Sequence, residues 1–107
     1  MNDPPGTVTH VVLIWLKDPQ DAAGKQRIIE ATRTFSRIPG VRRVAVGTAV
    51  PGTQPVVDST FDVGVAVTFS DRIALEGYGP HPIHQKAVKE VLQPLMKLVR
   101  VYDVESR

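Results

Sequence analysis

The sequence has no cysteine among its 107 residues, which removes disulfide bonds, thiolate metal ligands and cysteine nucleophiles at once. It also lacks any apolar run approaching the ~18 residues that a membrane-spanning helix needs. The N-terminal stretch has no basic segment followed by an apolar one, so no secretory signal is predicted and the expected compartment is the cytoplasm. No internal repeat of fixed period is present.

Charge of one sign is not concentrated anywhere in the chain. The 13 basic and 11 acidic residues are interspersed and leave a formal net charge of +2. The densest basic stretch, which ends at Arg42-Arg43, lacks the interleaved aromatic residues of a base-stacking surface. We therefore expect neither a nucleic-acid partner nor a membrane partner. The 42% hydrophobic and 22% charged composition is that of an ordinary globular domain.

Residues 1–6 are predicted to form a flexible tail, because Pro4-Pro5-Gly6 does not join a helix or a sheet easily. Residues 7–107 are predicted to form a single domain. Its first strand, over residues 7–17, is rich in β-branched and aromatic residues and is apolar on both faces. One face carries Val8, His10, Val12, Ile14 and Leu16, and the other carries Val11, Leu13 and Trp15. Such a strand must be covered on both sides.

The remaining elements follow from apolar periodicity and from turn residues. A helix is predicted from Asp21, a suitable N-cap, to about Ile38, where Pro39-Gly40 ends it. In the strand over 61–69, Phe61 is expected to share a face with Val63, and Gly64 leaves room for a close approach. The other expected elements are a strand over 41–50, a mobile loop at 51–55, a short helix over 71–78, a helix that begins at His84 and is perturbed at Pro94, and a strand over 98–104.

This order, β-α-β-β-α-β, is the split βαβ arrangement of ferredoxin-like α+β folds. Helices then cover one face of an antiparallel sheet and leave the other face open, which would expose Trp15 and its neighbours as a large apolar patch. A chain of this length also buries only a modest core alone. A second copy packed sheet to sheet resolves both problems. We therefore predict a homodimer that forms a dimeric α+β barrel.

Titratable side chains gather in the segment Tyr78-Gly79-Pro80-His81-Pro82-Ile83-His84-Gln85. The apolar spacing that follows places His84 on the buried side of a helix. Imidazole changes charge near neutral pH, so His84 is a candidate general base, and the hydroxyl of Tyr78 is a candidate to stabilise an oxyanion. By strand parity, His10 points either toward the helices or into the dimer core. In the first case it shares a cavity with His84.

Other interpretations of these histidines stay open. His10 and His84 can hydrogen-bond each other, or a backbone carbonyl, and simply hold the turn. A zinc or iron site at His10, His81 and His84 is disfavoured, because Pro82 interrupts the helical spacing and Asp103 is expected to be distant. No metal and no other cofactor is expected. His81 is interpreted as an exposed turn residue.

An apolar pocket for a small molecule is predicted beside His84. Its expected walls are Ala31, Phe35, Val65, Ala66, Val88 and Leu92. Two classes of function fit such a site. The first is a cofactor-free enzyme that transfers protons on a small carbonyl or polyketide-like compound. The second is a non-catalytic homodimer that binds an apolar small molecule or serves a structural role.

The chain resembles the stress-responsive A/B barrel domain (Dabb) family over about residues 7–104. The resemblance is carried by the segments 9–13, 38–41 and 61–69, and above all by His81-Pro82-Ile83-His84, which is similar to the family's His-Pro-x-His. It implies a small dimeric α+β barrel and, through the family's name, a link to stress response.

The resemblance extends distantly to one plant member, olivetolic acid cyclase, which folds a linear polyketide thioester by aldol condensation. This similarity implies that His84 is the base, that Tyr78 assists it, and that His10 matches a histidine of the first strand. The position of a further pocket tyrosine in that enzyme falls near Ala31 here.

Overall fold

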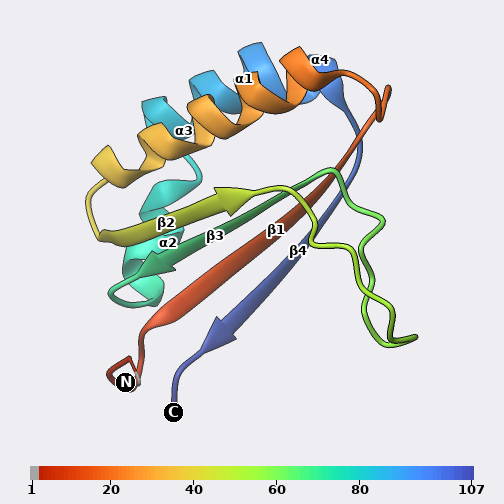
Figure 1. Ribbon diagram of the computed structural model, residues 1–107. Helices are drawn as coiled ribbons and strands as arrows, with labels where there is room; N and C mark the ends of the chain where they lie inside the picture. The colour runs from red at the N-terminus through yellow and green to blue at the C-terminus, as the bar shows by residue number, and fades with distance from the viewer. Residues whose placement is uncertain (1–2) are drawn as a thin grey trace.

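The computed structural model describes residues 3–107 and shows a four-stranded antiparallel sheet with helices on one face (Figure 1). The strands β1 (Val8–Leu16), β2 (Val41–Gly47), β3 (Val63–Phe69) and β4 (Met96–Glu105) lie in the order β2-β3-β1-β4. The helical segments are α1 (Ala22–Arg33), a 3₁₀ turn (Thr34–Arg37), α2 (Arg72–Tyr78), α3 (Pro82–Ala87), a π-helical turn (Val88–Leu92) and α4 (Gln93–Leu95). The predicted ferredoxin-like fold class is confirmed. None of the helices within residues 3–107 is long and apolar enough to cross a membrane.

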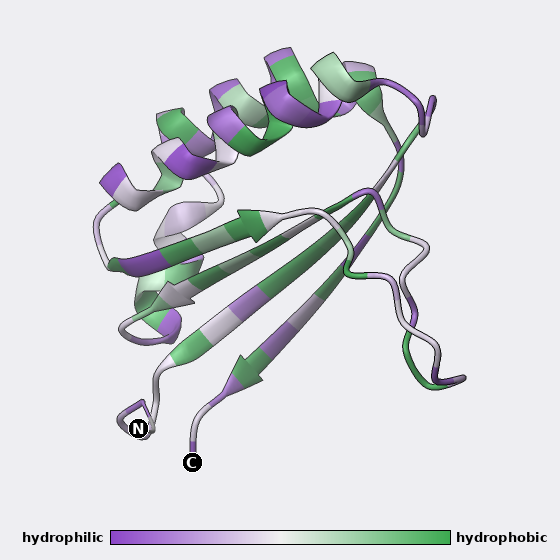
Figure 2. Ribbon diagram, viewed as in Figure 1, coloured by the Kyte–Doolittle hydropathy of each residue, from purple (hydrophilic) through white to green (hydrophobic). Residues whose placement is uncertain are grey.

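Side chains alternate between the two faces of each strand, and one face of the sheet packs against the helices. Ile14 of β1 and Val63, Val67 and Phe69 of β3 are each at most 1% exposed on this face. Figure 2 shows hydrophobic residues recurring along these strands beneath the helices. His10 belongs to the same alternating set as Ile14. The choice that the sequence left open is therefore settled, since His10 faces the helix layer.

The opposite face of the sheet has no covering layer within residues 3–107. On β4, the outward residues Leu98, Tyr102 and Val104 are 43%, 55% and 59% exposed. They pair with Trp15, Val11 and Thr9 of β1, so the apolar surface continues across both strands. An uncovered apolar surface of this kind is typical of an interface.

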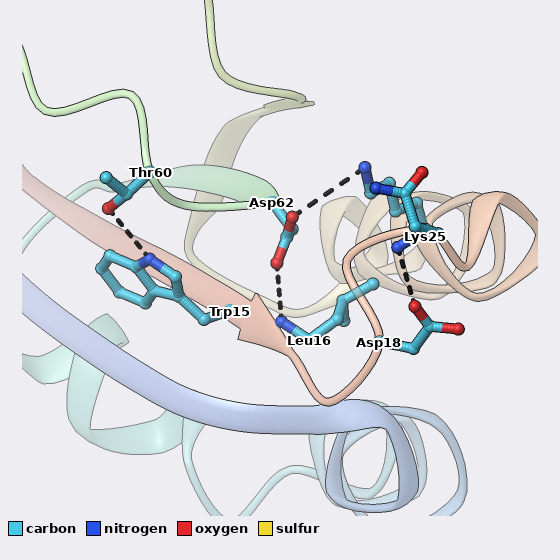
Figure 3. Close-up of polar contacts among 7 residues, drawn as sticks. Trp15, Leu16, Asp18, Lys25, Thr60 and Asp62 are labelled. Carbon is cyan, nitrogen blue, oxygen red and sulfur yellow. Dashed lines mark hydrogen bonds and ion pairs between the residues drawn. The ribbon is translucent and has the colours of Figure 1, made fainter.

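Phe61 lies on this open face, so the prediction that it shares a face with Val63 is wrong. Its ring meets Trp15 edge to face, with centroids 6.4 Å apart, and a Cβ placed on Gly64 would lie 3.0 Å from it. The group that approaches Gly64 closely, as predicted from the sequence, is therefore the ring of Phe61. The cause is Asp62, whose carboxylate accepts a 2.8 Å hydrogen bond from the backbone N–H of Leu16 and holds the chain before β3 begins (Figure 3).

The same close-up shows how the long connection from β2 to β3 is attached. The indole N–H of Trp15 donates to the hydroxyl of Thr60 at 3.0 Å, and Lys25 of α1 lies 3.9 Å from Asp62 (Figure 3). These contacts join the end of the connection to β1 and to α1. The rest of the connection extends away from the helix layer (Figure 1).

The helix expected to begin at His84 begins at Pro82 instead. His81 is its N-cap, and Nδ1 of its ring accepts a hydrogen bond from the N–H of Ile83 at 3.1 Å. Pro82 suits the first helical position because its missing N–H would have no intrahelical partner there. His81 is therefore a half-buried capping residue rather than an exposed turn residue.

The perturbation expected at Pro94 takes the form of the π-helical turn that precedes it. The N–H of Gln93 donates to the carbonyl of Val88, five residues back. Pro94 has no N–H to offer the carbonyl of Glu90, and a wider turn accommodates that loss. Asp21 is the N-cap of α1 as predicted, with its carboxylate 2.8 Å from the N–H of Gly24. The α-helix ends at Arg33 and continues as the 3₁₀ turn.

Part of the predicted N-terminal tail contacts the domain. Residues 1–2 lie outside the described residues. Asp3 pairs with Arg43 at 2.9 Å, and the N–H of Gly6 donates to the carbonyl of Ser106 at 2.8 Å. The flexibility of residues 1–6 stays a prediction.

Gly40→Ala is expected to destabilise the domain. Gly40 has φ +85°, which disfavours any residue with a side chain, and an added Cβ would lie 2.4 Å from the Cβ of Ala74 in α2. Strain and overpacking together should lower the free energy of unfolding by about 1–3 kcal/mol in urea denaturation. Gly47→Ala is the control, because nothing lies within 4 Å of a Cβ there. Equal stability of the two variants would refute this role for Gly40.

Candidate functional site

A cavity of about 200 Å³ lies between the helices and the sheet. One wall of the cavity comes from the sheet: His10, Val12, Ile14, Val65, Met96, Val99 and Val101. The other wall comes from the helical segments: Thr32, Phe35, Tyr78, His84, Val88 and Leu92. The lining is almost entirely apolar, with the imidazoles and the tyrosine as its main polar groups. Apolar cavities of about 150 Å³ are large enough to bind benzene. This cavity therefore suits a ligand built on one ring or a short chain.

Most of the residues predicted for the site meet in this cavity. His10, Tyr78 and His84 lie on its wall with four of the expected apolar residues, which are Phe35, Val65, Val88 and Leu92. These residues come from β1, from β3, from the helical segments and from the segment His81-Pro82-Ile83-His84 (the His-Pro turn), so the fold brings them together from distant parts of the chain. Their roles remain predictions.

Two predicted wall residues lie elsewhere. Ala66 lies on the open face of the sheet, because it follows Val65 in β3 and consecutive strand residues point to opposite faces. Ala31 lines a separate outer groove between α1 and α3. Thr32 occupies the wall position of α1 instead, and its hydroxyl donates to the carbonyl of Ile28 at 2.8 Å. Sequence reasoning missed Thr32 because a polar residue did not fit the apolar stripe, although back-bonding to the helix makes its burial acceptable.

His84 lines the cavity, and one nitrogen of its ring is bound to the backbone. Nδ1 lies 2.9 Å from the carbonyl oxygen of Gly79. A carbonyl can only accept, so Nδ1 holds the proton and Nε2 of the neutral ring holds a lone pair. Burial lowers the pKa of His84 below its ordinary value of 6.5, the bond to Gly79 opposes this, and His10 lowers it further. His84 is thus predominantly neutral near pH 7, as a base must be.

Tyr78, the last residue of α2, is buried among aromatic rings. Its ring centroid lies 4.3 Å from that of His84 and 5.4 Å from that of His10. Burial raises the pKa of Tyr78 well above its ordinary value of 10, and the negative charge of Asp103 raises it further. The hydroxyl therefore keeps its proton and is a hydrogen-bond donor for an oxygen atom in the cavity.

Asp103 is a charged residue beside the site that sequence reasoning also missed. Its Oδ1 lies 2.5 Å from Nδ1 of His10, so the expectation that it is distant is wrong. The cause is the register of β1 with β4, in which His10 and Asp103 are direct cross-strand partners. The signal available in the sequence was the antiparallel pairing of the first and last strands, which places the start of one beside the end of the other.

The hydrogen bonds bear on the alternative interpretations of the histidines. His84 does bond a backbone carbonyl, as a purely structural role would require. However, Nε2 of Gln85 also donates to the carbonyl of Gly79, at 2.8 Å, so that oxygen does not depend on His84. Within residues 3–107, no group of three or more histidine or acidic side chains is placed to hold a metal ion.

The lowered pKa of His84 predicts a pH-dependent stability. As the pH falls through 6.5, the unfolded chain takes up a proton at this position before the folded state does. The free energy of unfolding should therefore fall on acidification from 6.5 toward the lower folded-state pKa, and be unaffected above that window. Melting temperatures across this range should fall more steeply for the natural chain than for His84→Gln. Parallel curves would show that His84 is not responsible.

Comparisons with known proteins agree with this architecture. A family model described as Stress responsive A/B Barrel Domain matches residues 8–106. A dabb family protein with a ferredoxin-like fold from Mesorhizobium loti is 23% identical over 95% of this chain and 98% of that chain, with a TM-score of 0.76. A dimeric ferredoxin-like protein of unknown function from Thermobifida fusca is 18% identical over 98% and 95%, with a TM-score of 0.77.

A third similar structure is a hydroxynitrile lyase from Passiflora edulis. It is 20% identical over 97% of this chain and 96% of that chain, with a TM-score of 0.76. In sequence comparison, no curated protein matches the chain. At these identities the solved structures show a shared fold.

Proposed function

Because the chain belongs to the stress-responsive A/B barrel domain family, we propose that it is a homodimeric, cofactor-free enzyme that transfers protons on a small apolar carbonyl compound. The observation that carries the proposal is the placement of His84. Its ring lines an apolar cavity, its Nδ1 is fixed by Gly79, and its Nε2 is left as a base beside the protonated Tyr78.

The proposed step begins with a substrate whose carbonyl oxygen accepts a hydrogen bond from Tyr78. Nε2 of His84 takes a proton from the carbon next to the carbonyl group, and the C–H electron pair becomes the π bond of an enolate. Tyr78 stabilises the negative oxygen. In an aldol reaction, the enolate carbon then bonds to a second carbonyl carbon, whose C=O π pair moves to its oxygen, and that oxygen takes the proton from His84. Otherwise the enolate carbon regains the proton from His84. Neither route needs an oxidant or a reductant.

The size of the cavity narrows the substrate class. About 200 Å³ favours a single ring with short substituents over an extended polyketide chain. The name of the Passiflora edulis neighbour, a hydroxynitrile lyase, shows that this fold supports catalysis in at least one protein. That neighbour therefore supports the enzymatic class.

The open face of the sheet is the reason to propose a homodimer. Trp15 and the exposed residues of β4 form an apolar surface that a second sheet would cover. The Thermobifida fusca neighbour is described as dimeric, as are neighbours from Bacteroides fragilis and Jannaschia. A sheet-to-sheet pair is therefore the proposed assembly.

A non-catalytic binding protein is the second candidate. It is favoured by the bond from His84 to Gly79, which would also serve to hold the His-Pro turn. Such a protein would bind the same class of apolar compound and release it unchanged.

Solvent exchange of 2-indanone, a compact ketone with acidic hydrogens beside its carbonyl, separates the candidates. In D₂O, NMR should show that the protein accelerates replacement of these hydrogens by deuterium, with a rate that saturates as ketone is added. Tyr78→Phe should slow the exchange while leaving the fold intact. Binding without acceleration would favour the second candidate, and absence of binding would reject this ligand class.

A further inference from the structure

The pair formed by His10 and Asp103 is fixed by the backbone of the sheet. The two residues are direct partners in the β1–β4 ladder, and the neighbouring pairs Thr9–Val104 and Val11–Tyr102 hold the same register. The 2.5 Å contact therefore needs no long or mobile segment to form it. The side chain of His10 is 13% exposed, whereas that of Asp103 is 45% exposed.

This contact determines which nitrogen of His10 is available. A carboxylate oxygen accepts, so Nδ1 of His10 carries the shared proton and Nε2 of the neutral ring holds the lone pair. A carboxylate placed in this way orients an imidazole and stabilises the imidazolium that forms when Nε2 takes a proton. The exposed part of Asp103 also keeps the pair in contact with bulk water.

His10 faces the same cavity as His84, on the opposite wall. It comes from β1, whereas His84 comes from α3, and the ring of Tyr78 lies close to both, with centroid distances of 5.4 Å and 4.3 Å. Both imidazoles have Nδ1 bound to an acceptor, Asp103 in one case and Gly79 in the other. Each is left with Nε2 as its basic nitrogen.

We propose that Asp103 is the positioning residue of a second proton-transfer group, His10, so that the cavity holds two bases rather than one. The proposal deepens the proposed function and rests on the same cavity. It assigns His84 to protons on carbon and His10 to the proton of a substrate hydroxyl group. When that proton moves to Nε2 of His10, the oxygen keeps the electron pair and the carboxylate of Asp103 balances the new positive charge.

Two bases with separate targets suit one class of reaction. In the making or breaking of a carbon–carbon bond beside a hydroxyl group, one proton must move at carbon and another at oxygen. A hydroxyketone of one ring or a short chain would place both groups inside the cavity. Such a compound is a more specific expectation than a simple ketone.

Ring-nitrogen NMR of the ¹⁵N-labelled chain tests the role of Asp103 without any substrate. We expect the natural chain to show the Nδ1–H tautomer at His10. Asp103→Ala should shift His10 toward the Nε2–H tautomer that free imidazole prefers, with the spectrum of His84 almost unchanged. Asp103→Asn, whose amide oxygen still accepts, should retain the Nδ1–H tautomer. An Nε2–H tautomer in the natural chain, or no change in Asp103→Ala, would overturn the proposal.

Exchange of the hydroxyl-bearing probe 2-hydroxy-1-indanone adds the catalytic test. NMR in D₂O follows loss of the hydrogen on its hydroxyl-bearing carbon, with 2-indanone as the matched compound that lacks the hydroxyl. Asp103→Ala should slow exchange of the hydroxyketone more than that of 2-indanone. Equal slowing of both would overturn the assignment of His10 to oxygen. If the natural chain accelerates neither, the proposed function fails, while the tautomer measurement still decides whether Asp103 positions His10.

Discussion

Trp15→Glu is expected to convert the dimer into a monomer or an aggregate. Trp15 lies on the open face of the sheet, in contact with Phe61 and hydrogen-bonded to Thr60. In a sheet-to-sheet dimer, a carboxylate at this position would be buried without a partner, which is costly. Loss of a buried tryptophan from an interface typically weakens association by about 2–4 kcal/mol or more. Light scattering at micromolar concentration should therefore show the mass of one chain or of a large aggregate.

Ile73→Glu is the matched control for this substitution. Ile73 is 76% exposed on α2, outside the open face, so the same change in charge and polarity should leave the dimer intact. A natural chain that is monomeric at micromolar concentration would contradict the proposed assembly. A Trp15→Glu variant that remains a dimer would show that the interface lies elsewhere.

His84→Ala is expected to remove most of the exchange activity while the chain stays folded and dimeric. The substitution deletes the proposed base, and general acid–base catalysis typically contributes about 10²- to 10⁴-fold to a rate. Exchange of 2-indanone should fall by a factor in this range. Circular dichroism and light scattering should match those of the natural chain.

A purely structural His84 predicts a different outcome. Its removal would strand a buried partner and cost about 1–3 kcal/mol of unfolding free energy, with no activity to lose. We expect this loss of unfolding free energy to be small, because the carbonyl of Gly79 would still accept a hydrogen bond from Gln85. His84→Gln can replace the hydrogen bond but cannot take a proton near pH 7. Activity retained in His84→Gln would therefore exclude His84 as the base.

The fold was accessible from the sequence because its signals are local. Alternation identifies β1 and β3, Asp21 caps α1, and Gly40 ends the first helical segment at a backbone angle that suits glycine. The apolar second face of β1 further indicates a partner. These features depend on residues close together in the chain, so no knowledge of tertiary contacts was needed.

The candidate site was only partly predictable, because several of its contacts depend on register and on side-chain hydrogen bonds. Asp103 meets His10 through pairing between the first and last strands, which spacing along the chain does not reveal. Thr32 replaces Ala31 on the wall because it lies four residues after Ile28 on the buried face of α1, where its hydroxyl donates to the carbonyl of Ile28. Phe61 leaves its expected face because Asp62 is bound to Leu16.

The ring nitrogens of His84 give the most direct test of the claim that it is a base facing the cavity. In ¹⁵N NMR as a function of pH, we expect the Nδ1–H tautomer and a pKa below the ordinary value of 6.5, because burial outweighs the bond to Gly79. Addition of 2-indanone should move the Nε2 resonance. A proton on Nε2, a pKa at or above 6.5, or an Nε2 resonance unaffected by the ketone would contradict the account.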